Sequence, residues 1–578
     1  MAARRLTDRI KERLDREVGT IYKPHADRLK FALAFPNTYY IGMSNLGFQT
    51  VYRLINDDDR AVCERVFLPD PPDLEDITKS GNLLITMESQ MPVRSFDVLA
   101  FSLSYELDYP NVLKILSLSG LPLLSADRSP EMPLVIAGGP AATFNPEPLA
   151  PFIDVFILGE AEEVVPELIS ALWDNADDRN DLLLKLANIE GVYIPRFYEP
   201  EYNEDGTIRC VKASPDVPEK IHRRWVRNID LYPATTTILT PETEFSNMVL
   251  AEVARGCGRQ CRFCIAGYAY LPPRARTPGA VLDGIRRAEE KATERTIENP
   301  RIGLLSASVF DHPGSLLICE SLVEQNRLFS ISSTRADTLN QDVAQALHRG
   351  GHETLTIAPE AGTDRLRRVI NKAFTDREVL NAAAVARDAG FRRLKLYFMV
   401  GLPTETEEDI EGIHTLTSRI AGMFAWEKII VSVSCFVPKP WTPFQWAPME
   451  EESSLAAKLM SIKNSLRPVK RVEVMGESAR EAVVQGVLAR GDRRLRDALI
   501  AQHEENVSWR AAFRQGSVDP RFYAQRARGK EEIFPWDHLD LGVKKEYLWR
   551  EYENSMKEQS TTACLVGRCR RCGVCYYS

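Results

Sequence analysis

Short apolar runs alternate with helical stretches along the first part of the chain. Between residues 30 and 175 the apolar runs are KFALAF, VCERVFL, LLITM, VLAFSL, PLVIAG and DVFIL. Short strands that alternate with helices in this way are typical of an α/β fold with a parallel, doubly wound sheet. Loops at the carboxyl ends of such strands usually form the ligand site. We therefore expect a first domain of this kind over residues 1–185.

A second alternation follows, and the pattern changes again near the C-terminus. Six strand-and-helix units begin at MVLAEVAR and end at KIIVSVSCFVPKPW, which predicts a partial (β/α)6 barrel over residues 245–465. Residues 186–244 read as a linker or small β subdomain, with Asp205–Gly206 as a hairpin turn. Apolar residues at helical spacing predict a mostly helical domain over residues 466–578.

Composition narrows the class and the compartment. Of the 578 residues, 44% are hydrophobic and 27% are charged, as in ordinary soluble proteins. The net charge of −8 gives no overall electrostatic footprint for nucleic acid, and we expect the basic run Arg490–Arg496 to be a solvated helix face. No apolar run is long enough to cross a membrane. The charged N-terminal stretch lacks a signal-peptide core, so the eleven cysteines indicate a reducing cytoplasm.

Three cysteines stand directly after the first strand of the second alternation. Cys257, Cys261 and Cys264 form a CxxxCxxC pattern in ARGCGRQCRFCIAGY. Cysteine thiolates are the usual ligands of iron–sulfur clusters. Three thiolates without a fourth would leave one iron open to chelate a small molecule, whereas structural zinc needs four ligands and no His or Cys follows nearby. The pattern therefore favours an iron–sulfur cluster.

This loop resembles that of radical S-adenosylmethionine (SAM) enzymes, including the aromatic residue Phe263 before the last cysteine. The resemblance implies a 4Fe–4S cluster whose open iron holds the amino and carboxylate groups of SAM. It also implies reductive cleavage of SAM to methionine and a 5′-deoxyadenosyl radical, with an electron donor such as flavodoxin or ferredoxin as partner.

The same resemblance implies where SAM binds. Polar groups at the strand ends of the barrel would hold it: Ser306 and Ser308 the amino group, Glu360 the ribose hydroxyls, and the backbone at Gly401 the adenine, with Arg335 nearby. Arg335 and Glu360 also have an ordinary interpretation, in which they pair with each other or with surface partners. No catalytic residue beyond the cluster ligands is assigned.

The first domain resembles the Rossmann-like cobalamin-binding domain of some radical SAM proteins. The resemblance lies in GGPAATFNPEP followed by IDVFILGEAEE. Cobalamin domains of the mutase type carry a DxHxxG loop whose His ligates cobalt, but this chain has GMSNLG, with Gly42 and Ser44 at the Asp and His positions. Cobalamin would therefore bind without a protein imidazole on cobalt, or the domain keeps the fold without the ligand.

Four more cysteines close the chain. Cys564, Cys569, Cys572 and Cys575 form CxxxxCxxCxxC. They can supply a second 4Fe–4S cluster or a four-thiolate zinc site, or they remain unmetallated. Arginines between them make a basic tip that could contact RNA phosphate or offset thiolate charge.

The full layout resembles an uncharacterised family of radical SAM proteins with an N-terminal cobalamin-binding-like domain. The predicted function is a cytoplasmic radical SAM enzyme, with methyl transfer to an unknown substrate if cobalamin binds. One alternative is a methylthiotransferase-like modification of RNA or protein that uses a second cluster. Another is a non-catalytic cluster protein that senses or docks on RNA. The substrate could be RNA, protein or a small molecule.

Overall fold

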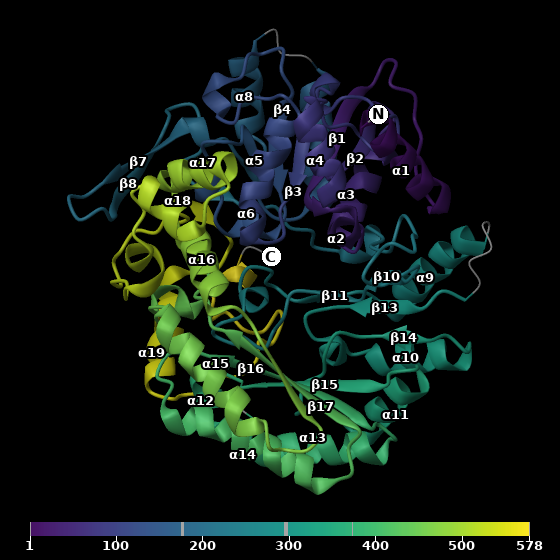
Figure 1. Cartoon of the computed structure of the whole chain (residues 1–578), viewed down its shortest axis with the longest axis vertical. Coiled ribbons are helices and arrows are strands. Elements are labelled where there is room, and N and C mark those ends of the chain that lie inside the picture. Colours follow the sequence, from purple (N-terminus) through teal and green to yellow (C-terminus); the bar gives the residue numbers. More distant parts are fainter. Residues whose placement is uncertain (1, 175–177, 294–298, 373, 577–578) are drawn as a thin grey trace.

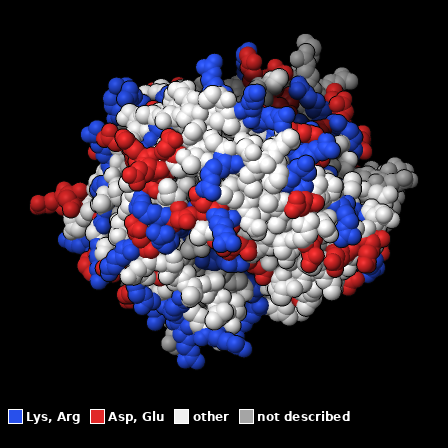
Figure 2. Space-filling model, turned by 90° about the horizontal axis from the view of Figure 1, so that it is seen from below, with Lys and Arg blue, Asp and Glu red and all other residues white. Residues whose placement is uncertain are grey.

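The computed structural model describes residues 2–174, 178–293, 299–372 and 374–576. Figure 1 shows the N-terminal α/β unit at the top, a second α/β unit below it, and the C-terminal residues along one side of both. Within the described residues, no helix is both long and apolar enough to cross a membrane. Acidic and basic side chains are interspersed over most of the face in Figure 2, in keeping with the modest net charge.

The N-terminal unit is built on a six-stranded sheet. Its order is β2 (Ala61–Leu68), β1 (Leu29–Thr38), β3 (Val98–Ser102), β4 (Leu134–Gly138), β5 (Val155–Ile157) and β6 (Val192–Tyr193). All neighbours pair in parallel except β6, which is antiparallel to β5. The predicted parallel, doubly wound sheet is confirmed. Its carboxyl edge faces the second unit.

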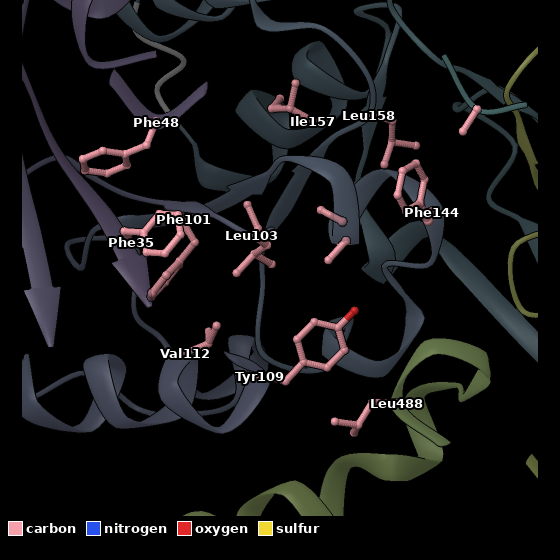
Figure 3. Close-up of a cluster of buried hydrophobic side chains, with 14 of the residues drawn as sticks. Phe35, Phe48, Phe101, Leu103, Tyr109, Val112, Phe144, Ile157, Leu158 and Leu488 are labelled. Carbon is pink, nitrogen blue, oxygen red and sulfur yellow. The ribbon is translucent and has the colours of Figure 1, made fainter. Parts of the chain in front are cut away.

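Helices cover this sheet. They are α1 (Ala2–Arg16), α2 (Tyr39–Met43), α3 (Leu46–Asp57), α4 (Pro71–Ser80), α5 (Tyr109–Leu118), α6 (Pro140–Phe144), α7 (Ala161–Trp173) and α8 (Arg179–Ala187). Both α3 and α7 contact β1 and each other, whereas α5 contacts β1 and β2. Figure 3 shows part of the aromatic and aliphatic core here, which Leu488 approaches from the C-terminal region.

One expected strand of this unit is absent. The run LLITMES makes only an isolated bridge between Ile85 and Pro92. Two of its polar members are buried instead: the Glu88 carboxylate pairs with the buried guanidinium of Arg65 at 2.6 Å, and Thr86 is fully buried. The segment is apolar because it packs under the sheet edge, which a hydrophobic pattern alone does not distinguish from a strand.

The second unit is a partial barrel of parallel strands in two sheets. One sheet holds β10 (Val249–Glu252), β13 (Ile302–Leu305) and β14 (Phe329–Ser330). The other holds β15 (Thr354–Glu360), β16 (Arg393–Val400), β17 (Lys428–Cys435) and β18 (Val472–Gly476). A parallel bridge between Thr334 and Ile357 connects them. The predicted partial barrel is confirmed.

Strand β18 extends that barrel beyond the six expected units. It pairs in parallel with β17 from Val472 to Gly476. Its sequence, VEVMG, is short and mostly exposed, so it gives no apolar run for the pattern to find. The predicted boundary at residue 465 stays a prediction, although this strand lies after it.

Helices surround the barrel, and shorter elements connect the units. The helices are α9 (Pro278–Thr293), α10 (Ser315–Glu324), α11 (Gln341–Arg349), α12 (Asp364–Val369), α13 (Asp376–Asp388), α14 (Glu407–Met423) and α15 (Glu452–Leu466). The short strands are β7 (Tyr198–Tyr202), β8 (Ile208–Ala213), β9 (Ile221–His222), β11 (Ala254–Arg255), β12 (Arg274–Ala275) and β19 (Leu539–Asp540). Strands β7 and β8 form the predicted hairpin around Asp205–Gly206.

The C-terminal residues are mainly helical, as expected. They contain α16 (Ala479–Arg490), α17 (Arg496–Glu505), α18 (Trp509–Gln515) and α19 (Lys545–Met556). The end of α16 reaches the N-terminal unit, because the Asn145 side-chain amide donates to the carbonyl oxygens of Ala489 at 3.1 Å and Gly491 at 2.8 Å. This region therefore connects the two α/β units as well as packing on the barrel.

Candidate radical centre and cofactor cavity

The CxxxCxxC loop lies at the carboxyl end of the first barrel strand. The backbone passes from β10 through β11 into Gly256, which has a left-handed φ of 77°. A Cβ at Gly256 would lie 2.3 Å from the carbonyl oxygen of Tyr270, so only glycine fits this turn. The turn brings Cys257 close under the strand end, where barrel enzymes place their reacting groups.

The three thiols of this loop are electrostatic neighbours. Burial, together with the smaller effects of the nearby Cys261 and Cys257, raises the pKa of Cys264 to about 12. Burial also raises the pKa of Cys257, with a contribution from Cys261. Within the described residues, no three His, Cys, Asp or Glu side chains meet the geometry of a bound metal ion. The three thiolates would repel one another in the absence of a metal. The positive iron ions of a bound cluster would offset this repulsion and favour deprotonation of the thiols.

Residues between the cysteines anchor the loop to distant parts of the chain. The guanidinium of Arg262 is fully buried, pairs with Glu551 of α19 at 3.1 Å, and donates to the Val369 carbonyl oxygen at 2.9 Å. The side-chain oxygen of Gln260 accepts from the Tyr547 hydroxyl at 2.8 Å. These contacts fix the ligand loop against α12 and α19.

The C-terminal tail lies on the same loop. The Cys564 N–H donates to the Gly258 carbonyl oxygen at 2.7 Å, directly beside Cys257. Burial raises the pKa of Cys564 to about 11, and the thiols of Cys569, Cys572 and Cys575 add to the rise. The tail cysteines are therefore neighbours of one another and of the first cysteine loop. Which metal they bind stays a prediction.

The five predicted SAM-binding residues all follow or end barrel strands. Ser306 lies just after β13 and lines a cavity between the two α/β units, and its hydroxyl accepts from the Ser308 N–H at 3.3 Å. Gly401 follows β16 with a left-handed φ of 82°, and its N–H donates to Glu405 at 2.8 Å. The buried carboxylate of Glu405, which the sequence pattern did not single out, is therefore the group that orders this turn.

Arg335 and Glu360 have separate partners rather than each other. The guanidinium of Arg335 binds Asp337 at 2.9 Å, and Glu360 binds Lys372 at 2.9 Å. Glu360 also has a left-handed φ of 68°, an uncommon conformation for a residue other than glycine. Strain of this kind gathers at functional sites. Their contact with SAM remains a prediction.

Sequence reasoning missed a third charged group beside the cysteines. Arg259, within the loop itself, binds Asp311 at 2.8 Å and Asp337 at 3.3 Å. Asp337 thereby accepts from both Arg259 and Arg335, which ties the cysteine loop to the segment after β14. The signal in the sequence that could have identified Arg259 is its position as a charged residue between two predicted ligand cysteines.

A cavity of about 510 Å³ lies between the two α/β units. On the barrel side it is lined by residues beside the cysteine loop, including Gly256 and Ala266, and by Tyr270 and Ser306. On the other side it runs into a crevice between the N-terminal sheet and helices α3 and α7. The crevice walls are mostly aliphatic, as is usual for sites that bury an organic ligand.

Strand register explains the crevice. Leu33, Ala100 and Ile136 lie side by side on β1, β3 and β4, with Ser102 beside Gly138 one step further along. All five line the cavity. Because alternate residues of a strand share a face, the small residues Ala100, Ser102 and Gly138 leave space between this face and the two helices.

A charge network at the mouth joins the two units. Arg255, which precedes the cysteine loop, pairs with Glu160 at 2.9 Å, Glu162 at 2.7 Å and Glu252 at 2.9 Å. Glu160 and Glu162 belong to the GEAEE segment, and Glu160 also pairs with Arg274 at 2.6 Å. The GEAEE segment therefore joins the first domain to the strand end that precedes the cysteine loop.

The GMSNLG turn contributes Asn45 to the cavity. Its side chain caps α3 by accepting from the Phe48 N–H at 2.9 Å, as capping chemistry predicts. No histidine is among the described residues that line the cavity. A corrin ring placed here would thus have no imidazole ligand from these residues, in agreement with the sequence.

The parallel sheet, the partial barrel and the cysteine loop at a strand end together define an α/β enzyme built for a cluster at the barrel mouth. A family model described as "Radical SAM proteins, N-terminal" matches residues 47–195, and one described as "Radical SAM superfamily" matches residues 251–417. An uncharacterized protein of Methanocaldococcus jannaschii is 34% identical over 71% of this chain and 81% of its own length. The chain belongs to the radical SAM superfamily. It is an enzyme of that class, with a 4Fe–4S cluster and SAM as cofactors.

Other similar proteins are more distant. An uncharacterized methyltransferase of Pyrococcus horikoshii is 26% identical over 48% of this chain and 56% of its own length. The solved structure of the radical S-adenosylmethionine methyltransferase TsrM from Kitasatospora setae, with cobalamin and a 4Fe–4S cluster bound, has 12% identity. It covers 85% of this chain and 99% of that one, with a TM-score of 0.48.

Proposed function

We propose that this enzyme uses the cluster at Cys257, Cys261 and Cys264 to cleave SAM reductively, and cobalamin in the 510 Å³ cavity to methylate a carbon atom. The observation that supports it is the continuity of the cavity, which runs from the sheet crevice to Gly256 and Ala266 beside the cluster ligands. One continuous space would therefore serve both cofactors. The substrate would be an organic molecule with an unactivated C–H bond.

When bound, the cluster and SAM would supply a 5′-deoxyadenosyl radical, and cobalamin would supply the methyl group. The residues of the chain itself would bind these cofactors and shield them from water. Ala100, Ser102 and Gly138 make room for a large ring system, and the aliphatic walls around them exclude water. The Arg255 network fixes the distance between the two sites.

The residues present fit a large organic cofactor that would be held without a protein imidazole. The crevice between the sheet and helices α3 and α7 is lined by mostly apolar residues, with Leu46, Thr50 and Val51 among those of α3, and these residues would hold the cofactor there. The backbone turn at Gly139, with φ of 100°, packs against the Leu103 carbonyl, where a Cβ would come within 2.6 Å. This close approach keeps the crevice mouth free of side chains.

The decisive experiment loads the protein anaerobically with iron, sulfide and hydroxocobalamin, then measures cobalt and iron after desalting. The Ala100→Trp variant should lose cobalt while it keeps iron and SAM cleavage, because the indole fills the crevice and not the barrel. Leu231→Trp, on a residue that is 70% exposed, is the size-matched control and should bind normally. Equal cobalt in wild type and Ala100→Trp would contradict the cobalamin proposal.

Reductive cleavage is tested separately by release of 5′-deoxyadenosine under dithionite. Cys257→Ala should abolish that release, because it removes a cluster ligand. A wild-type protein with a full cluster that releases none would favour the docking or sensing alternative over an enzyme.

A second candidate, methylthio transfer to RNA or protein, is favoured by one contact. The hydrogen bond from Cys564 to Gly258 places the tail cysteines beside the radical loop, where a second cluster could act as sulfur donor. In that case Cys572→Ala would lose acid-labile sulfide and product while cleavage of SAM continues.

A further inference from the structure

The basic run Arg490–Arg496 is not the solvated helix face that the sequence predicts. Arg490 is fully buried at the end of α16, and Arg528 is only 7% exposed. Arg493 pairs with the buried Glu147 of the N-terminal unit at 2.9 Å. The first part of the run, from Arg490 to Arg493, therefore lies inside the junction of three parts of the chain, whereas Arg496 at its end is exposed. The expectation of solvation was wrong for Arg490 and Arg493, because charge in a sequence does not report burial.

The Arg490 guanidinium is only partly satisfied there. Its Nη1 donates to the carbonyl oxygens of Ala447 at 2.8 Å and Ala524 at 3.2 Å. Its Nε and Nη2 have no hydrogen-bond partner within the described structure. A buried, unpaired donor on a charged group costs more free energy than any other unsatisfied donor.

Arg528 faces the same space with a similar deficit. Its Nη2 donates to the carbonyl oxygens of Arg490 at 3.2 Å and Tyr523 at 3.1 Å. Its Nε, also buried, has no hydrogen-bond partner among the described residues, and the closest carboxylate oxygen, on Glu532, is 4.0 Å away. Two adjacent guanidinium groups thus leave three N–H-bearing nitrogens unused.

Nearby carboxylates do not balance these charges. A cavity of about 10 Å³ is bordered by four arginines and two acids: Arg490, Arg494, Arg526, Arg528, Asp492 and Glu532. Asp492 is held by Arg494 at 2.6 Å, and Glu532 by Arg526 at 2.5 Å. The two acids are therefore engaged by the other two arginines, and an excess of two positive charges remains around the cavity.

Both guanidinium groups carry a positive charge at neutral pH, because arginine side chains are not deprotonated in proteins. Burial and the neighbouring arginines lower the pKa of Arg490, and burial lowers the pKa of Arg528 to about 10. Loss of a proton therefore does not balance the excess positive charge in the physiological pH range, whereas a bound anion would.

We propose that this cavity binds a single monatomic anion, chloride under physiological conditions, between the side chains of Arg490 and Arg528. The volume is about that of one water-sized particle, which is too small for phosphate, sulfate or a carboxylate ligand. A water molecule would fill the space but leave the charge uncompensated. The proposal is independent of the cobalamin chemistry.

Such an ion would stabilise the contact between the two α/β units. The segment that carries Arg490 is the one whose carbonyl oxygens, at Ala489 and Gly491, receive the Asn145 amide. Arg490 itself donates to Ala447, in the segment between β17 and α15 of the barrel unit, and to Ala524 of the C-terminal region. One bound anion would therefore offset one of the two excess positive charges at the point where all three parts meet.

The first test is thermal unfolding of the full-length protein in sodium chloride and in sodium gluconate at equal ionic strength. Chloride should raise the Tm by about 2 °C over 0 to 150 mM, as expected for a ligand that binds the native state alone. Arg490→Met should remove this difference, whatever its own stability. Arg496→Met, an exposed arginine six residues on, is the matched control and should keep it.

The second test does not depend on any variant folding. Crystals of the wild-type protein grown in sodium bromide should show one anomalous peak in the cavity between Arg490 and Arg528. A peak for water without anomalous signal, or a Tm that does not distinguish chloride from gluconate, would overturn the proposal.

Discussion

The backbone N–H of Cys564 donates a hydrogen bond of 2.7 Å to the carbonyl oxygen of Gly258. One residue belongs to the C-terminal tail and the other to the radical SAM loop. A Cβ added at Gly258 would lie 3.4 Å from the Cβ of Cys564, so the two backbones are in van der Waals contact. The two cysteine motifs of this chain, distant in sequence, therefore share one surface.

This contact predicts two metal centres that can be separated by substitution. Cys257→Ala should lose the iron of the radical cluster, and Cys572→Ala should lose only the metal of the tail. Anaerobic elemental analysis for iron, zinc and sulfide measures both. Cys210→Ala, a half-buried cysteine outside both motifs, should match wild type. Loss of all iron in Cys572→Ala would show that the two sites are not independent.

Gly256→Ala should impair cluster assembly. The substitution forces a left-handed φ of 77° on alanine and places its Cβ 2.3 Å from the Tyr270 carbonyl oxygen, so the turn must shift beside Cys257. We expect affinity for the cluster to fall about tenfold, as for other groups that orient metal ligands. Iron retention during titration with a chelator measures it. Gly529→Ala has open space around its Cβ and serves as the control.

Arg255→Met should separate the two α/β units. The change leaves the carboxylates of Glu160 and Glu162 buried without this partner, and breaking a buried pair typically costs about 3–5 kcal/mol. The free energy of unfolding in urea should fall by that order, with loss of cobalt from the loaded protein. Arg286→Met is the control. Arg286 is 63% exposed and pairs with Glu290 on the surface of one helix, so its loss should change the free energy of unfolding by less than about 1 kcal/mol.

Asp108 should make the protein less stable as pH rises from about 4 to 6. Burial raises the pKa of its carboxyl from 3.8 to about 6, against hydrogen bonds from Asn37 and Asn111 that lower it. In that window the folded state binds more protons than the unfolded state, so the free energy of unfolding falls with pH, by up to about 3 kcal/mol. Asp108→Asn should abolish this fall and stabilise the protein at pH 7.5.

Urea unfolding at several pH values checks the effect of Asp108. Asp497→Asn, on an exposed carboxylate, is the control and should leave the pH profile unchanged. If the free energy of unfolding of the wild type changed from pH 4 to 6 with the same slope as that of Asp108→Asn, the raised pKa of the buried Asp108 carboxyl would be contradicted.

Much of the chemistry was readable from the sequence. The spacing of Cys257, Cys261 and Cys264 and the alternation of strands and helices are local properties, so they identified the superfamily and the barrel without coordinates. The same holds for the hairpin turn at Asp205–Gly206, because it depends on residues a few positions apart.

Only the tertiary structure decided which distant groups meet. Arg335 pairs with Asp337 and Glu360 with Lys372, the LLITMES run packs without forming a strand, and Arg490 is buried although its neighbours in sequence are charged. The cavity exists because small residues on two neighbouring strands align in register and because Glu160 and Arg255 hold two units together. Periodicity and spacing report what lies along the chain, but burial and pairing depend on contacts between residues far apart in it, and those are fixed only when the whole chain packs.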